Sequence, residues 1–377
     1  MTIPFNKPFL TGNETAYIKQ AVASGKISGD GAFTQKCHQL LQQTYGFTKC
    51  LLTTSCTDAL EMAALLANIQ PGDEVIAPSY TFVSTVNPFV LRGAVIVFCD
   101  SRPDHPGIDE GKIEVLVTDK TKAIVVTHYA GIACDMDIVM DIANRHQLMV
   151  IEDAAHAIDS FYKNKPLGSI GNMSAFSFHE TKNIIAGEGG MIVLNDQSLI
   201  ERAEIVREKG TNRSKFFRGE VDKYSWVDVG SSFLPSDITA AFLYAQLENL
   251  SAIQQRRKNI WETYYNALLP LHEAGKVSLP VLPGYATNNG HIFYMVCQTG
   301  AGRDALISWM RSKGILAIFH YLPLHESIFF KHQYNGKPLP HATRYANQLI
   351  RLPLFYTLTP AEQQYIIEQV KGFYAVR

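Results

Sequence analysis

Residues 176–190 read FSFHETKNIIAGEGG, in which a strand-like run leads to one lysine and then to a glycine-rich turn. A second strand-like run, Met191–Leu194, follows the turn, so Lys182 is expected just beyond the end of a strand. Ligands of α/β proteins bind at such strand ends. Partial burial there would lower the pKa of the Lys182 amine and prepare it to form a Schiff base with an aldehyde. Most lysines lie on solvated surfaces, so this segment alone leaves both interpretations open.

The pattern around this segment predicts an α/β fold. Seven short apolar, β-branched runs are expected as strands: Cys50–Thr54, Glu74–Ala77, Val95–Cys99, Ala123–Thr127, Leu148–Ile151, Ser174–Phe178 and Met191–Leu194. Helix-like segments, among them Thr57–Asn68 and Asp137–His146, separate most of the first five. This alternation predicts right-handed crossovers and a mainly parallel seven-stranded sheet covered on both faces. The last two strands, separated only by the lysine loop, need not be parallel.

Beyond about residue 235 the pattern changes to helices and proline-punctuated strands. The expected elements are helices Ser236–Glu248 and Ile253–Leu269, strands Val277–Leu282, Ile292–Val296 and Ala317–Tyr321, and helices near His341–Arg351 and Pro360–Phe373. A chain of 377 residues is too long for one compact core. We therefore expect a large domain, 1–248, with an N-terminal arm, and a smaller α+β domain, 249–377, joined through a long helix.

The composition argues against several classes of partner. A formal net charge of −1 and an isoelectric point near 6.9 provide no basic field for nucleic acid. The longest positive cluster, Arg256–Lys258, is expected on a solvated helix face. Six cysteines without a C-x-x-C pair indicate reduced thiols in the cytoplasm rather than disulfides or a zinc knuckle. Since the N-terminus lacks an apolar signal core and no window approaches the roughly 18 apolar residues of a membrane span, we also expect no membrane partner.

A second informative stretch is LMVIEDAAH, residues 148–156, where a buried strand ends in two carboxylates and an imidazole follows. Neighbouring strands would bring Asp153 and Lys182 into one pocket. Pyridoxal phosphate needs this pair, because a lysine holds its aldehyde and a carboxylate pairs with its protonated ring nitrogen. The alternative is that Asp153 only caps a following helix.

Two more stretches are compatible with that cofactor. The hydroxyl-rich loop TTSCTD, residues 53–58, precedes a helix, where free N–H groups and the helix dipole favour phosphate. A plain N-cap is the alternative, and the charge of Asp58 would repel phosphate unless its side chain points elsewhere. Phe82 could stack on a cofactor ring or belong to the core. Nucleotide-binding signatures are absent, and His320 and His325 lack the H-E-x-x-H spacing, so we expect no metal.

Taken together, these stretches resemble the sugar aminotransferases of the DegT/DnrJ/EryC1/StrS type, which act on nucleotide-linked keto sugars and have fold type I of the pyridoxal-phosphate enzymes. The resemblance covers essentially the whole chain and rests on SGKISGDGAFTQKC, TSCTDALEMAAL, GDEVIAPSYTFVSTVN, VIEDAAHA, FSFHETKN, GEGG, GSSFLPSDITAA, FHYLPLH and RLPLFY. Within the family, FSFHETKN, EKGTNRSKFFRGEVDKYSW and FHYLPLH are most similar to the dTDP-4-amino-4,6-dideoxygalactose transaminases of enterobacterial common antigen synthesis.

The resemblance implies how the cofactor ring is held. Lys182 would be the catalytic residue, which binds the cofactor aldehyde and moves protons to and from the substrate carbon. Asp153 would pair with the ring nitrogen and Phe82 would stack on the ring. His156 would lie near the phenolic oxygen, where many relatives have glutamine, so its hydrogen bond depends on its protonation.

The resemblance also implies a phosphate site and a shared active site in a homodimer. Ser177, Thr57 and the backbone of Asp58 would hold the phosphate. Relatives often have an asparagine in the loop that corresponds to Gly230–Ser236, from which the partner subunit reaches the phosphate. Here Ser231 or, as we assign it, Ser232 would take its place.

The implied reaction moves the amino group of L-glutamate, through the amine form of the cofactor, to C4 of dTDP-4-dehydro-6-deoxy-D-glucose. A basic, aromatic rim suits such an anionic nucleotide. The candidates for that rim are Arg213, Lys215, Arg218, His320, Tyr321 and His325.

Three other functions remain open at this point. One is an aminotransferase that acts at C3 or gives the opposite C4 configuration. Another is a sugar dehydratase, although those relatives usually have histidine in place of the lysine. The third is a non-catalytic sensor that only binds the cofactor and the sugar.

Overall fold

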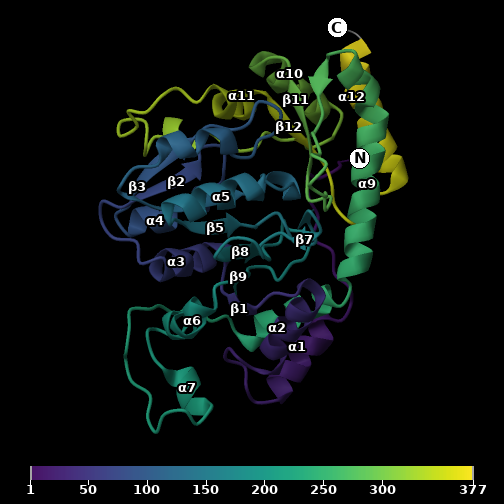
Figure 1. The fold of residues 1–377 in the computed structure, drawn as a ribbon. Coiled ribbons are helices and arrows are strands. Elements are labelled where there is room, and N and C mark those ends of the chain that lie inside the picture. The colour runs from purple at the N-terminus through teal and green to yellow at the C-terminus, as the bar shows by residue number, and fades with distance from the viewer. Residues whose placement is uncertain (1, 376–377) are drawn as a thin grey trace.

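The computed structural model describes residues 2–375, and its centre is a seven-stranded sheet (Figure 1). The strands are β1 (Lys49–Thr53), β2 (Glu74–Pro78), β3 (Val95–Cys99), β4 (Thr121–Thr127), β5 (Met149–Asp153), β8 (Met173–Ser177) and β9 (Gly190–Leu194), in the order β1-β9-β8-β5-β4-β2-β3. All seven predicted strands are confirmed, with ends that differ by at most two residues.

Within this sheet, β9 runs against the other strands. Parallel pairing joins β3, β2, β4, β5 and β8, whereas β9 is antiparallel to both β8 and β1. The chain reverses because the connection from β8 to β9 is the lysine loop, which contains no crossover helix. The sheet is therefore mainly parallel, as predicted, and the loop lies at the edge where the parallel strands end.

Helices cover both faces of the sheet. On one face lie α2 (Ala32–Tyr45), α5 (Met136–His146) and α8 (Asp237–Leu247), and on the other α3 (Cys56–Leu66), α4 (Asn87–Leu91) and α6 (Ile200–Arg207). Along β4, Ile124 and Val126 pack with the first group, and Ala123 and Val125 with the second. Successive strand residues point to opposite faces, so a strand buried on both sides is apolar throughout.

Smaller elements complete this part of the chain. They are α1 (Glu14–Ala23), which packs on α8, α7 (Arg213–Phe217), the hairpin of β6 (Phe161–Tyr162) and β7 (Lys165–Pro166), and 3₁₀ turns at Val83–Thr85, Glu110–Lys112, Glu114–Leu116, Tyr129–Gly131 and Gln197–Leu199. A further 3₁₀ turn, Leu324–Glu326, lies in the C-terminal part. Among residues 2–375, every helix is too short or too polar to cross a bilayer.

The C-terminal part has its own apolar cluster and its own sheet. Its elements are α9 (Leu250–Glu273), α10 (Gly300–Ser312), α11 (Pro340–Gln348), α12 (Pro360–Ala375), β10 (Val277–Ser278), β11 (Phe293–Cys297) and β12 (Leu349–Leu352). The strands pair antiparallel in the order β10-β11-β12. Figure 1 shows α9 running along one side of the molecule to this sheet.

Three predictions differ from the structure in this part. The strand predicted at Val277–Leu282 is limited to Val277–Ser278. Residues Ala317–Tyr321 do not form a strand, and only Ile318 bridges to Arg351. Tyr321 has a left-handed φ of 52°, which an extended strand cannot accommodate. Conversely, the predicted last helix turn up to Arg351 is strand β12, because β11 offers it a pairing edge.

The N-terminal arm crosses to the C-terminal part. Ile3 bridges to Ile315 and is buried in the C-terminal apolar cluster. The proposed domain boundary after residue 248 lies just before α9, which begins at Leu250. The start of the chain therefore packs with the smaller part, although we had assigned it to the larger one.

Gly190 allows the loop before α3 to lie directly on β9. A Cβ at this position would lie 2.3 Å from the carbonyl carbon of Ser55 and 2.4 Å from the nitrogen of Cys56. A Cβ so close to backbone atoms would clash with them unless the start of α3 moved, so only glycine fits at this position. The glycine-rich turn thus joins the lysine loop to the hydroxyl-rich loop.

We expect Gly190→Ala to lower the free energy of unfolding by about 1–3 kcal/mol or more, because the added methyl group overpacks this contact. Chemical denaturation would measure the change. The control is Gly372→Ala in α12, where an added Cβ meets nothing within 4 Å. Alanine favours a helix over glycine by about 1 kcal/mol, so the control should be neutral or slightly stabilising. An unchanged free energy of unfolding for Gly190→Ala would contradict the close contact between Gly190 and the backbone of Ser55 and Cys56.

Candidate active site

A cavity of about 1020 Å³ lies where the parallel strands end and the C-terminal part begins. It brings together eight of the predicted site residues, which come from five separate stretches of the chain. They are Thr57, Phe82, Asp153, His156, Ser177, Lys182, His320 and Tyr321.

The lysine loop is a closed turn at the cavity wall. Its two sides are joined by backbone hydrogen bonds from Phe178 N to Gly189 O (2.8 Å) and from Glu180 N to Gly187 O (2.9 Å). Burial lowers the pKa of Lys182 to about 8, although negative charge on Cys56 and Asp153 would act in the opposite direction. The amine therefore has a substantial neutral, nucleophilic fraction near neutral pH.

Asp153 is a buried carboxylate without a basic partner among residues 2–375. Thr85 Oγ1 donates to Oδ2 (2.6 Å) and Ala155 N donates to Oδ1 (3.1 Å). Burial raises the pKa of this carboxyl group, and these two donors counteract the shift. A turn rather than a helix follows β5, so Asp153 is not a helix cap. Its free side faces the cavity, where a protonated ring nitrogen would supply the missing charge.

The hydrogen bonds of His156 determine which ring nitrogen is protonated. Ala130 N donates to Nδ1 (3.3 Å), and burial holds the pKa of His156 well below its usual range. The neutral imidazole therefore carries its proton on Nε2, which lies 3.4 Å from Tyr321 Oη. This N–H can serve the phenolic oxygen of the cofactor as the amide of a glutamine would, without protonation of the ring.

The hydroxyl-rich loop caps helix α3 at the wall of the cavity. Ser55 is the N-cap of α3, because its Oγ accepts a hydrogen bond from Asp58 N (3.0 Å). This corrects the prediction that the Asp58 backbone binds phosphate, since its N–H is already used. The Asp58 carboxylate accepts from Thr54 Oγ1 and does not line the cavity. The helix N-terminus and the hydroxyls of Thr57 and Ser177 suit a phosphate.

Phe82 and the segment around Tyr321 form an aromatic wall. Phe82 is 54% exposed and lines the cavity, so it is not a core residue. Its ring lies 6.1 Å from that of Tyr321, which in turn stacks on His320 at 3.6 Å. Tyr129 Oη fixes His320 through Nδ1 (2.8 Å). The cavity can therefore hold a flat ring beside Lys182.

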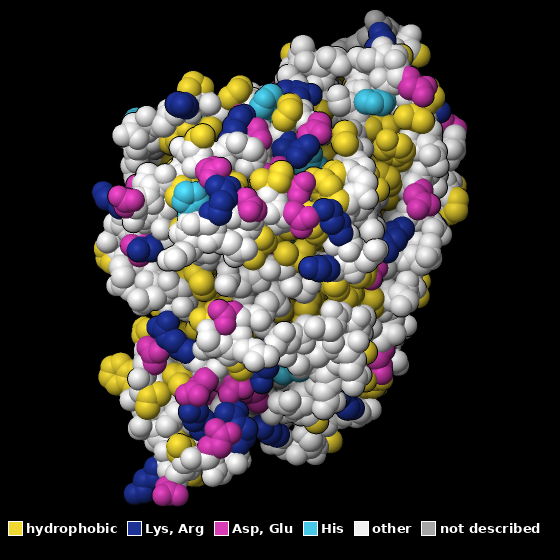
Figure 2. Space-filling model, viewed as in Figure 1, with side chains coloured by type: hydrophobic (Ala, Val, Ile, Leu, Met, Phe, Trp, Pro, Cys, Tyr) yellow, Lys and Arg dark blue, Asp and Glu magenta, His cyan; other side chains and the backbone are white. Residues whose placement is uncertain are grey.

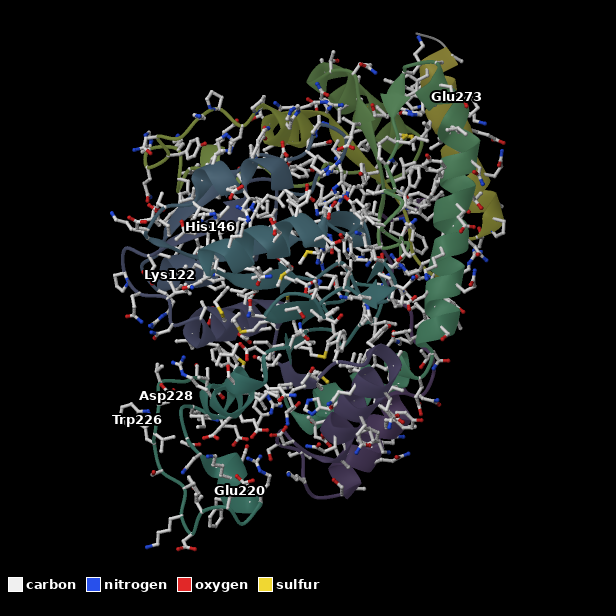
Figure 3. The ribbon with its side chains drawn as sticks, in the orientation of Figure 1. Lys122, His146, Glu220, Trp226, Asp228 and Glu273 are labelled. Carbon is white, nitrogen blue, oxygen red and sulfur yellow. The ribbon has the colours of Figure 1, made fainter. Side chains whose placement is uncertain are left out.

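Three predicted rim residues lie elsewhere in this chain. Arg213, Lys215 and Arg218 belong to α7 and its end, which lie at the opposite end of the molecule from α10 and α11 (Figure 1). Figure 2 shows charged side chains gathered there, and Figure 3 shows Glu220 and Trp226 on the same projecting segment. None of the three lines the cavity. Lys215 pairs with Glu201 (2.5 Å), and Arg218 pairs with Glu204 (2.8 Å) and Glu220 (2.6 Å).

Two other predicted residues are also outside the cavity. His325 is buried, and its Nδ1 is hydrogen-bonded to Ser79 Oγ (2.7 Å), so it fixes its own segment to the end of β2. Ser232 is exposed and bridges to Glu208. Its role was assigned across the subunit interface, so it stays a prediction.

The cavity also contains residues that the sequence analysis did not select. Arg257 was expected on a solvated helix face but is buried, where it donates to the carbonyls of Gly290, His291 and Leu354. The remaining ones are Thr85, which orients Asp153, and the cavity-lining Phe5, Asn6, His291 and Arg351. RLPLFY contains Arg351, but its sequence offered no sign that this arginine faces the lysine. Among residues 2–375, no group of three or more His, Cys, Asp or Glu is arranged to hold a metal ion.

A lysine of lowered pKa, an unpaired carboxylate at a neighbouring strand end and a hydroxyl-lined helix N-terminus at the same cavity are the features of a pyridoxal-phosphate-dependent transferase of fold type I. The chain belongs to the DegT/DnrJ/EryC1/StrS aminotransferase family, whose model matches residues 8–371. It is a pyridoxal-phosphate-dependent sugar transaminase.

Individual relatives agree with this assignment. The spore coat polysaccharide biosynthesis protein SpsC of Bacillus subtilis is 30% identical over 98% of this chain and 96% of its own length. The sugar aminotransferase Spr1654 of Streptococcus pneumoniae, solved in forms named for PLP and PMP, is 27% identical in its PMP-form, with a TM-score of 0.91 over 99% of both chains. PseC of Helicobacter pylori, an aminotransferase of pseudoaminic acid biosynthesis, has a TM-score of 0.89 at 25% identity over all of both chains.

We expect the reaction of Lys182 with an aldehyde to have a pH midpoint near 8. Below this pH the amine is protonated and cannot attack, and above it the amine is neutral. The rate at which cofactor-free enzyme takes up pyridoxal phosphate, followed by absorbance over a pH series, measures this. The Lys182→Ala variant should lose the signal. A midpoint at the ordinary lysine value of 10.5 would contradict the burial of Lys182.

We expect Asp153→Asn to lower kcat by about 100-fold or more, the usual loss when a preorganised electrostatic group is removed from a buried site. The amide keeps the shape of the side chain but has no charge for the ring nitrogen. Rapid-mixing absorbance with an amino donor would measure the step, and cofactor content would be checked in parallel. Unchanged kinetics in a fully loaded variant would contradict this role of Asp153.

Proposed function

We propose that the protein transfers the amino group of L-glutamate to C4 of dTDP-4-dehydro-6-deoxy-D-glucose and forms dTDP-4-amino-4,6-dideoxy-D-galactose. The observation that carries the proposal is that His320 and Tyr321 of FHYLPLH line the same cavity as Lys182. That segment is one of the three whose resemblance indicated this group of transaminases. The relatives in spore coat polysaccharide and pseudoaminic acid biosynthesis are compatible with a role in enterobacterial common antigen or another surface polysaccharide.

Each of these cavity residues would have its own role in the reaction. When bound, pyridoxal phosphate withdraws electrons from the carbon that carries the transferred nitrogen. Lys182 removes a proton from the α-carbon of the donor and later delivers one to C4 of the sugar. Asp153 keeps the ring nitrogen protonated, and His156 donates its Nε2–H to the phenolic oxygen. The face from which Lys182 delivers the last proton determines the configuration of the new amine.

We also infer a homodimer with shared active sites, acting in the cytoplasm. In one chain the α7 segment is remote from the cavity, yet its aromatic side chains are exposed, 81% for Trp226 and 67% for Phe217. A partner subunit could cover these side chains and receive Arg213, Lys215 and Arg218 at its own cavity. The rim for the nucleotide diphosphate would then be complete only in the dimer.

The product of the purified enzyme tests the proposal. With dTDP-4-dehydro-6-deoxy-D-glucose and L-glutamate, NMR should show nitrogen on C4 in the axial orientation of the galacto configuration. The control is Lys182→Ala, which should give no product.

Three outcomes would contradict the proposal in different ways. An equatorial amine at C4, or an amine at C3, would assign the chain to another sugar aminotransferase on the same scaffold. Cofactor absorbance that does not respond to glutamate would favour a non-catalytic sensor.

A further inference from the structure

Arg351 is a cation at the cavity wall without an anionic partner. Among residues 2–375, no carboxylate lies within 4.0 Å of its guanidinium, and its buried Nε has no hydrogen-bond partner. The single hydrogen bond from its side chain is a long one, from Nη2 to Phe319 O (3.4 Å). A guanidinium has five N–H donors, so most of its capacity is unused. A charge held in this way needs an anion from outside the chain.

The second arginine of the cavity provides the contrast. Arg257 donates from Nε to Gly290 O (3.1 Å) and from Nη2 to His291 O (2.7 Å) and Leu354 O (3.4 Å). These carbonyls fix α9 to the segment before β11 and to the segment after β12. Arg257 is therefore a structural residue, whereas most of the N–H donors of the Arg351 side chain have no hydrogen-bond partner within the described chain.

The surroundings of Arg351 hold it in position while most N–H groups of its guanidinium stay without a partner in the part of the chain that the structure describes. Its guanidinium carbon lies 4.6 Å from the ring centroid of Phe5, a cation–π contact from the N-terminal arm. The next residue, Asn6, donates to Glu180 O in the lysine loop (3.3 Å). Backbone hydrogen bonds of 2.8 Å and 3.2 Å join Arg351 to Ile318, two residues before His320. The arm, β12 and the lysine loop thus meet around this side chain.

We propose that Arg351 binds the α-carboxylate of the amino donor. The carboxylate is bonded to the carbon that gives up its nitrogen beside Lys182, so it must lie in the part of the cavity next to Lys182, and Arg351 lines the same cavity. The planar guanidinium matches a carboxylate in a two-point contact. The diphosphate of a nucleotide sugar is attached to C1, across the sugar ring from C4, and would lie nearer the mouth. This assignment rests on the proposed function in one respect, that the donor is an amino acid.

The test compares Arg351→Met and Arg351→Lys with the parent enzyme in each half-reaction. We expect Arg351→Met to raise the KM for glutamate about 10- to 100-fold, the usual value of hydrogen bonds to a charged group. The KM for the keto sugar should stay within roughly twofold, since its ring carries no charge at this position. Arg351→Lys should raise the KM for glutamate less than Arg351→Met does, because lysine keeps the positive charge although it cannot make the two-point contact.

One binding measurement gives a readout that does not depend on turnover, and a second amino donor separates the two carboxylates of glutamate. Calorimetry with glutarate, an unreactive dicarboxylate, should show weaker binding to Arg351→Met, and absorbance should show unchanged cofactor content. L-Alanine has only the α-carboxylate, so Arg351→Met should raise the KM for its slow reaction by the same factor as the KM for glutamate. A loss with glutamate alone would place the side-chain carboxylate on Arg351 and overturn the assignment.

The control is Arg311→Met on the exposed surface of α10, which should leave both half-reactions unchanged. Thermal unfolding checks that the Arg351 variants fold, and Arg351→Lys keeps the test valid if Arg351→Met does not. A raised KM for the sugar nucleotide with an unchanged KM for glutamate would assign Arg351 to the diphosphate instead. An enzyme that takes nitrogen from glutamate but delivers it to another carbon would refute the C4 proposal and leave the Arg351 assignment standing.

Discussion

The buried carboxylate of Glu152 holds together the strand ends on which the active site is built. Its Oε2 accepts hydrogen bonds from His128 Nε2 (2.9 Å) and Gly168 N (2.8 Å), and its Oε1 from Ile170 N (2.8 Å) and Gly171 N (2.7 Å). These donors follow β4 and precede β8, so one side chain of β5 fixes three neighbouring strands. A fully bonded buried carboxylate is rigid because every alternative position leaves donors unpaired. The end of β5 and the start of β8 are therefore held in a fixed arrangement, and Asp153, the next residue of β5, lines the cavity.

The buried charged residues at this cavity or next to it are of two kinds: some have all their hydrogen bonds within the protein, and others do not. Glu152 and Asp153 follow each other in β5, and successive side chains of a strand point to opposite sides. Glu152 is satisfied within the protein, whereas Asp153 keeps one side free for the ring nitrogen. Arg257 and Arg351 show the same division on the other wall. Since burying an unpaired charge is costly, the open member of each pair indicates where a ligand must complete the structure.

Much of the fold could be predicted because its signal is local. The strands of the large sheet other than the edge strand β3 are buried on both faces, so their apolar runs are visible in the sequence without knowledge of their neighbours. The errors lie in the smaller sheet, where pairing decided the outcome. Leu349–Leu352 is a strand because it pairs with the edge of β11. Ala317–Tyr321 is not a strand, because the backbone of Tyr321 is left-handed. The position of α7 could not be predicted either, because the composition of a loop contains no information on where the loop lies in the fold.

The sequence by itself determined the sheet, the strand-end positions of Asp153 and Lys182, and the family, since each depends on short contiguous patterns. Only the tertiary structure decided which donors were already used. It showed that Ser55 occupies the N–H of Asp58, that His325 is bound to Ser79, and that Arg351 lies open in the cavity. The physical reason is that a hydrogen bond between distant residues depends on their separation in space. Residue type shows what a side chain can bind, and the fold determines whether that capacity is still free.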